Sequence, residues 1–389
     1  NNKEQKEWSD DLLKRAIYKR NGVAVCLLDT GVNTSHSLIE PAVDDSHIQA
    51  LNNTWDKYDN QGHGTEMAGV LLFNDLREAL QTTSKVEVPY ELESVKILPS
   101  NGANKPELYG HVTEQAVSLA EIANPGAKRV VCMAVSSPEY STYDGSPTSW
   151  SAAIDSITSG ANEENEKRLF LVSAGNVIPS EFENSSYPEA NELHGVESPG
   201  QSWNAITVGA YSKDVQVFNN EYRDFEPVAS MYGLSPYSST SLTWKKSWPV
   251  KPEVLFDGGN IVTNGKDFLE SPDLEILTTY YQPYVKQFST INATSSATAQ
   301  AGWFCGQLIS AYPDFWPETI RALMIHSAEW TDEMKRQFCQ EDTKRKGRYT
   351  LLRTCGYGIP NLEKAIQCVN NSVNMIIQGE LQPFPYKDS

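Results

Sequence analysis

Four side chains from separate parts of the chain could together hydrolyse an acyl bond: Asp29, His63, Asn176 and Ser295. A serine hydroxyl becomes a strong nucleophile when an imidazole accepts its proton, and a carboxylate on the second ring nitrogen orients that imidazole. An asparagine amide can donate a hydrogen bond to the oxyanion that forms. We therefore predict a catalytic group of Asp29, His63 and Ser295, with Asn176 as the oxyanion donor.

Apolar runs of strand length precede two of these residues. They span 22–28, 129–135, 169–172 and 205–208, and helical patterns span 66–72, 113–123, 149–157 and 297–311. Continuously apolar strands are typical of sheets covered on both faces, so the alternation predicts an α/β fold with a parallel sheet. Asp29 and Asn176 would then lie at carboxyl ends of strands, where such sheets place their sites. The less regular interval 212–290 predicts loops and short strands of the same domain.

The composition excludes several classes of protein. The chain has 389 residues, is 39% hydrophobic and carries a net charge of −18. This charge argues against binding of nucleic acid or an anionic membrane surface, because phosphate contacts need clustered lysine and arginine. No apolar stretch approaches the roughly 18 residues of a membrane span. The chain does not begin with methionine, and we expect a processed segment or an upstream domain before it.

The cysteines bear on the redox compartment. The six of them form no Cys-x-x-Cys pair, and at least three lie inside apolar runs, where they would be small buried residues. Free thiols indicate a reducing compartment, so we expect a cytoplasmic location. An even number of cysteines leaves disulfides open, above all among Cys339, Cys355 and Cys368.

The motifs around the four residues resemble those of the subtilisin-like serine peptidases, or subtilases. The order Asp, His, Ser with an asparagine donor is that of subtilisin, whereas chymotrypsin and the α/β-hydrolases use other orders. The matching segments are Asp29-Thr30-Gly31 with His36, His63-Gly64-Thr65 with Ala68-Gly69, and Ser173-Ala174-Gly175-Asn176. Further matches lie at 206–210, 237–239, 251–254 and 356–360. The likeness spans about 22–365 and implies a three-layer fold with helices on both faces of a mostly parallel sheet.

The segment around the serine departs from the family pattern. Subtilases usually have Gly-Thr-Ser-Met-Ala there, whereas this chain has Ala293-Thr294-Ser295-Ser296-Ala297. Alanine in place of glycine restricts the backbone before the nucleophile, and Ser296 offers a second hydroxyl. We favour Ser295 because it follows Thr294 in register. Glu66 adds a carboxylate near the histidine, where secreted subtilisins commonly carry another polar residue.

The resemblance also implies where a substrate binds. Two extended segments would pair with its backbone, one around Gly110 and one at 133–137. The residues expected to contact substrate are Gly110, Ala134, Val135, Ser136, Ser173 and Gly175. The walls of the pocket for the side chain before the cleaved bond, at 134–137 and 173–175, are small and uncharged. They suggest apolar or medium-sized side chains at that position.

No cofactor is needed for this chemistry, and no metal site is predicted. The histidines besides His63 lack the spacing of metal ligands, and we expect structural roles for His36, His47, His111, His194 and His326. Calcium is an expectation from the family that can be assigned to no residues here. Some similar bacterial subtilases have an N-terminal extension and are encoded beside an AAA ATPase, so the resemblance implies such an ATPase as a partner.

We divide the chain into an N-terminal lead-in at 1–21, a peptidase domain at 22–370 and a C-terminal tail or linker at 371–389. The predicted activity is that of a serine endopeptidase acting on proteins or peptides. Two alternatives stay open: an inactive subtilase-fold module that binds peptides, favoured by the altered serine segment, and a transpeptidase or esterase that uses the same acyl-enzyme.

Overall fold

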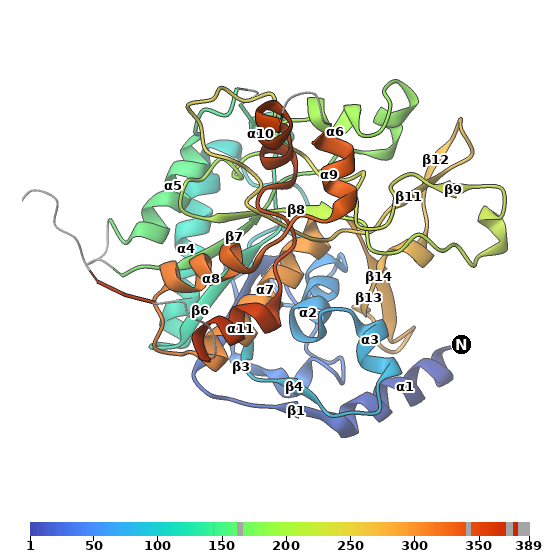
Figure 1. The fold of residues 1–389 in the computed structure, drawn as a ribbon. Coiled ribbons are helices and arrows are strands. Elements are labelled where there is room, and N and C mark those ends of the chain that lie inside the picture. The colour runs from blue at the N-terminus through green and yellow to red at the C-terminus, as the bar shows by residue number, and fades with distance from the viewer. Residues whose placement is uncertain (143, 162–165, 340–343, 371–375, 380–389) are drawn as a thin grey trace, which may run out of the picture.

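A seven-stranded parallel sheet forms the middle layer of the protein (Figure 1). The computed structural model describes residues 1–142, 144–161, 166–339, 344–370 and 376–379. In spatial order the strands are β10 (Val254–Asp257), β8 (Ile206–Tyr211), β7 (Leu169–Ser173), β6 (Lys128–Met133), β2 (Val23–Asp29), β5 (Glu91–Lys96) and β3 (Val43–Ala50). All neighbours run parallel. The predicted α/β fold is confirmed.

Helices cover both faces of this sheet. On one face lie α4 (Tyr109–Ala123) and α5 (Ser149–Ser159), and on the other lie α2 (His63–Phe73), α7 (Ala293–Ala311), α8 (Pro317–Ser327) and α11 (Leu362–Asn370). Strand β2 shows why its residues are apolar without interruption. Val25 and Leu27 face the α2 and α7 layer, whereas Cys26 and Leu28 face the α4 and α5 layer. Both faces are therefore core.

Small residues let α2 and α7 pack closely. A side chain added at Gly302 of α7 would begin 2.3 Å from Leu71 of α2. Most of α7 is buried, and the helix crosses strands β10, β8, β7, β6 and β2. This packing fixes the first residues of both helices, His63 and Ala293, relative to the sheet.

The remaining elements surround these layers. They are α1 (Asn2–Arg15), β1 (Ala16–Tyr18), α3 (Leu76–Gln81), β4 (Val86–Val88), α6 (Glu189–Leu193), β9 (Glu226–Pro227), β11 (Ile261–Thr263), β12 (Phe268–Glu270), β13 (Ile276–Thr279), β14 (Phe288–Ile291), α9 (Asp332–Phe338) and α10 (Lys344–Cys355). Short 3-10 helices lie at Glu40–Ala42, Pro106–Leu108, Pro138–Tyr140, Pro179–Glu183, Asn220–Tyr222 and Pro272–Leu274.

The terminal and irregular segments match expectation only in part. The interval 212–290 does contain loops and short strands, but β10 within it extends the central sheet, which four residues were too few to predict. The N-terminal segment 1–21 forms α1 and β1, with Leu12 buried and β1 paired to β4. The predicted tail at 371–389 lies outside the described residues except for 376–379. No helix in the described ranges is long and apolar enough to span a membrane.

The cysteines in the described part of the chain are free thiols. Cys26, Cys132, Cys305 and Cys355 are buried, and Cys339 is partly exposed. Cys339 and Cys355 therefore form no disulfide with each other, and the side chain of Cys368 lies outside the described residues. Burial raises the pKa of the Cys355 thiol to about 12 and that of the other buried thiols as well.

A buried ion pair in the sheet gives a test of the fold. Glu93 of β5 accepts two hydrogen bonds from Arg129 of β6, at 2.6 and 3.0 Å, and both side chains are almost fully buried. Arg129→Met would leave the Glu93 charge buried and unpaired, so we expect it to lower the free energy of unfolding by about 3–5 kcal/mol. Replacing both, as Glu93→Leu with Arg129→Met, should cost much less. Denaturant unfolding measures both variants, and equal losses would contradict this account.

Candidate active site

Asp29 and His63 are joined by a hydrogen bond. Asp29 ends β2 and is fully buried, and its Oδ1 lies 2.8 Å from Nδ1 of His63. The same oxygen accepts the backbone N–H of Thr30 at 2.7 Å. The carboxylate thereby fixes Nδ1 as the protonated nitrogen and leaves Nε2 free to accept a proton.

A second carboxylate shapes the loop that carries His63. Asp59 is buried and accepts backbone N–H bonds from Gln61, Gly62 and Thr65, at 2.8 to 2.9 Å. It also accepts the hydroxyls of Thr30 and Thr65. Asp59 thus ties the end of β2 to the start of α2. Sequence reasoning missed it, although an aspartate four residues before the histidine was a visible signal.

Glycine is required where α2 meets the turn after Asp29. A side chain added at Gly64 would begin 2.0 Å from the carbonyl oxygen of Gly31. The backbone of Gly31 and that of Gly62 have positive φ angles of 99° and 105°. These glycines allow the close approach that brings His63 to Asp29.

The serine pair sits in the first turn of α7, and its members differ. The Ser296 hydroxyl is buried and lies within hydrogen-bond distance of the carbonyls of Asp257 and Ala293, at 3.0 and 2.9 Å. The Ser295 side chain is half-buried, and in the described part of the chain its hydroxyl has no hydrogen-bond partner. Ser296 therefore anchors α7 to β10, while the Ser295 hydroxyl is available.

Asn176 is oriented by the residue before Ser295. Its Oδ1 accepts both the backbone N–H and the hydroxyl of Thr294, at 3.0 and 2.6 Å. A backbone N–H can only donate, so Oδ1 must face Thr294 and the Nδ2 group must face away from it. Within the described residues this Nδ2 donates to no other group. The Nδ2 group is therefore free to donate a hydrogen bond.

These contacts pair Asp29 with His63 and Asn176 with Thr294, at the starts of two helices that pack together. The family model described as "Subtilase family" matches residues 20–358.

The chain belongs to the subtilase family.

This confirms the resemblance inferred from the motifs.

Individual relatives agree with this assignment. The chain is 24% identical over 319 residues to the subtilisin of Bacillus sp. strain TA39 and 24% identical over 322 residues to the serine protease AprX of Bacillus subtilis strain 168. Each alignment covers 80% of this chain and 62% of the relative. The chain therefore spans less than two thirds of the length of these relatives.

Solved structures share the fold. A lanthipeptide protease superposes with a TM-score of 0.56 at 18% identity, covering 90% of this chain and 89% of its own. The S41 psychrophilic protease gives a TM-score of 0.54 at 20% identity, covering 81% and 85%. The predicted three-layer subtilisin-like fold is confirmed.

Two departures from the family pattern have local effects in this subtilase. Ala293, where glycine is usual, has a φ of 64°, in the left-handed region that disfavours a side chain. Glu66, in the first turn of α2, has its pKa raised by burial. Its charge acts on the neighbouring imidazole.

The residues expected to contact substrate fall in two groups. Ala134, Val135 and Ser136 follow β6, whereas Ser173 and Gly175 lie at the end of β7, the adjacent strand. Both segments therefore reach the sheet edge that carries Asn176.

Gly110 does not belong with them, and the expected extended segment around it is wrong. The residue lies in the first turn of α4, where a side chain would begin 2.9 Å from Ala153 of α5. Its lack of a side chain serves helix packing.

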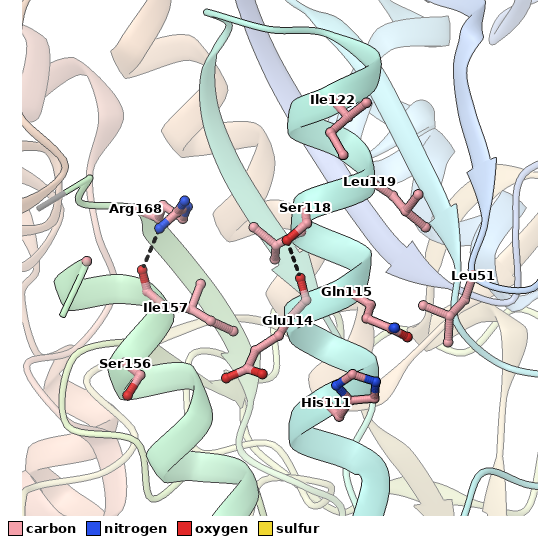
Figure 2. Close-up of a pocket in the computed structure, with 12 residues that line it drawn as sticks. Leu51, His111, Glu114, Gln115, Ser118, Leu119, Ile122, Ser156, Ile157 and Arg168 are labelled. Atoms are coloured by element: carbon pink, nitrogen blue, oxygen red, sulfur yellow. Dashed lines mark hydrogen bonds between the residues drawn. The ribbon is translucent and has the colours of Figure 1, made fainter. Parts of the chain in front are cut away.

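Two of the surface pockets differ in how close they lie to the predicted catalytic residues. Figure 2 shows the one over α4 and α5, about 500 Å³ in volume, with Glu114, Leu119 and Ile122 along its α4 side. None of the predicted catalytic residues lines it. The other, about 1110 Å³, borders the loop before His63 and includes Asp59 and Tyr281 in its lining.

Three of the other histidines are held by different partners. His36 bonds the carbonyl of Gln287 through Nε2, His47 lies 3.4 Å from Glu91, and His194 lies between two glutamates. The described residues contain no cluster of three or more histidine, cysteine or acidic side chains able to hold a metal.

The ionisation of His63 can be tested directly. Burial is the largest single effect and lowers the pKa of His63. The charge and hydrogen bond of Asp29, together with the charges of Glu66 and Asp59, outweigh it and raise the pKa to about 9. The stability that the Asp29 pair confers is thus complete below the ordinary imidazole pKa of about 6.5 and is lost as the pH rises through about 9.

We expect Glu66→Gln to lower the pKa of His63, because it removes a negative charge in the same helical turn. NMR titration of the imidazole in the Ser295→Ala background measures this shift, with Glu363→Gln on α11 as a control that changes an acid elsewhere. An unshifted titration in Glu66→Gln would contradict the electrostatic role of Glu66.

Proposed function

We propose that this subtilase is a serine endopeptidase that hydrolyses peptide bonds through an acyl-enzyme. The observation that carries the proposal is the 2.8 Å hydrogen bond between buried Asp29 and His63. That bond prepares an imidazole to take a proton at Nε2. The available hydroxyl of Ser295 supplies the proton and the nucleophile.

In the first step, the Ser295 Oγ attacks the carbonyl carbon of the substrate while its proton passes to Nε2 of His63. The imidazolium that forms is stabilised by the Asp29 carboxylate, which remains ionised. Because only neutral imidazole accepts a proton, activity is lost as the pH falls below the pKa of His63.

The attacked carbonyl becomes an oxyanion, for which two donors are free. One is Nδ2 of Asn176. The other is the backbone N–H of Ser295, which bonds to no described residue although its neighbours Thr294 and Ser296 use theirs. The start of α7 adds the positive end of a helix dipole.

Collapse of the tetrahedral intermediate breaks the C–N bond, and the leaving amine takes the proton from His63. Water then attacks the acyl-enzyme, with His63 as base, and releases the acid and free Ser295. His63 delivers a proton to the leaving amine, so the departing half of the substrate lies on the side of the site where His63 lies. The hollow of about 1110 Å³ beside the His63 loop is the space we assign to it.

The acyl half of the substrate lies on the opposite side, between the ends of β6 and β7. We assign its contacts to Ala134, Val135, Ser136, Ser173 and Gly175. If the substrate pairs there like an added strand, its main chain makes most of the hydrogen bonds, which suits protein and peptide substrates. The ATPase partner and the cytoplasmic location stay predictions.

The competing functions separate in one experiment. A fluorophosphonate probe labels an activated serine, so labelling at Ser295 supports an enzyme, and a folded protein without labelling supports a peptide-binding module. Mass spectrometry of products formed from a peptide in the presence of an added amine distinguishes hydrolysis from ligation, and a matched ester tests esterase activity.

We expect Ser295→Ala to abolish both peptide cleavage and probe labelling, because Ser296 cannot replace it from its buried position. Ser296→Ala should retain most of the activity and lose some stability, because it loses the bond to the carbonyl of Asp257. The matched variants are compared by kcat/KM and thermal unfolding. An inactive Ser296→Ala variant together with an active Ser295→Ala variant would show that Ser296, not Ser295, is the nucleophile.

We expect Asn176→Ala to lower kcat by about 10²–10³-fold with little change in KM, because its amide acts on the oxyanion. Thr294→Val, which removes only the hydroxyl that orients this amide, should cost less than Asn176→Ala. Steady-state kinetics on one peptide measures both. A change confined to KM would remove Asn176 from the mechanism.

A further inference from the structure

A loop that sequence reasoning passed over connects the two substrate walls. The backbone N–H of Glu197 donates to the carbonyl of Ala174, and the carbonyl of Ser198 accepts the N–H of Ser137, both at 2.9 Å. Residue 197 is therefore held between the segment after β6 and the segment after β7. Its side chain has to lie among the residues that line this space.

The Glu197 carboxylate contacts both walls. Oε2 accepts the hydroxyl of Ser136, and Oε1 accepts the backbone N–H of Asn176 at 3.3 Å. A side chain added at Gly175 would begin 2.4 Å from Cγ and Cδ of Glu197, so the glutamate occupies the space over this glycine. Glu197 is only 5% exposed. The walls are small and uncharged, as predicted, but a carboxylate lies between them.

The charge around Glu197 stays negative. Its other close partner is His194, whose Nε2 lies 3.4 Å from Oε1 and whose Nδ1 lies 3.3 Å from Glu181. Two carboxylates and one imidazolium carry a net charge of −1, and a neutral imidazole leaves −2. In the described part of the chain no lysine or arginine pairs with Glu197. A buried carboxylate in this position is stabilised by a cation.

We propose that Glu197 forms the floor of the pocket for the P1 side chain, the residue whose carbonyl is attacked, and selects lysine or arginine there. The inference rests on the proposed peptidase function. The P1 Cα is bonded to the carbonyl carbon whose oxygen faces Nδ2 of Asn176, and Glu197 hydrogen-bonds the backbone of the same asparagine. A long cationic side chain entering between the walls therefore reaches this carboxylate. Acidic P1 pockets select basic residues in other serine peptidases. This replaces the expectation of apolar or medium-sized P1 residues.

The test compares fluorogenic peptides that differ only at P1, with lysine, arginine, leucine or glutamine. Wild type should cleave the lysine and arginine peptides with kcat/KM about 30-fold or more above the neutral ones. Glu197→Gln keeps the size of the side chain and removes its charge, so it should abolish this preference with little change for the leucine peptide. Glu189→Gln on α6 is the matched control, because its carboxylate contacts Ser186 rather than His194 or the walls, and it should keep the preference.

A binding measurement separates this proposal from the peptidase function. In the Ser295→Ala variant, calorimetry should show tighter binding of the lysine peptide than of the leucine peptide, and Glu197→Gln in that background should remove the difference. If proteins with an intact Glu197 bind the lysine and leucine peptides equally, or cleave them equally, the proposal is overturned. Neither comparison uses the Glu197→Gln variant, so its folding does not affect the outcome. Selective binding by a wild type that cleaves nothing would support Glu197 and overturn the peptidase function alone.

Discussion

The parallel direction of the seven strands is the constraint on which the site depends. Because every strand runs the same way, the carboxyl ends of β2, β6 and β7 meet at one edge of the sheet. Asp29 ends the first of these strands and Asn176 follows the last. Helices α2 and α7 pack against each other on one face of the sheet, and His63 and Ser295 lie in their first turns. The sheet thereby gathers residues from distant parts of the sequence.

Polar groups with no part in bond making hold this arrangement. Asp59 fixes the loop before α2 through five hydrogen bonds, and Thr294 fixes the amide of Asn176 through two. Asp59 and Thr294 are buried, so their bonds are largely shielded from competing water. The loop before His63 and the amide of Asn176 are thus held in place without a substrate, so the proposed reaction would need little reorganisation of them.

The places of Asp29 and Asn176 in the fold could be predicted because both residues stand at regular positions. Asp29 and Asn176 follow long apolar strands, so their placement follows from strand direction alone. Glu197 was missed because it stands in an irregular loop, where no periodicity shows which way a side chain points. Gly110 was placed wrongly because the resemblance implied an extended segment there, whereas the residue lies in the first turn of α4. Its contact with Ala153 of α5 is long-range and invisible in the local pattern.

The residue after Ser295, the proposed nucleophile, also affects the chemical durability of the site. Subtilases usually have methionine there, and a methionine thioether is converted by peroxides into a polar, chiral sulfoxide. In this chain the position is Ser296, whose hydroxyl is buried against the main chain of β10. A hydroxyl has no corresponding oxidation under those conditions. The substitution that ties α7 to the sheet therefore also removes the oxidisable sulfur from beside Ser295.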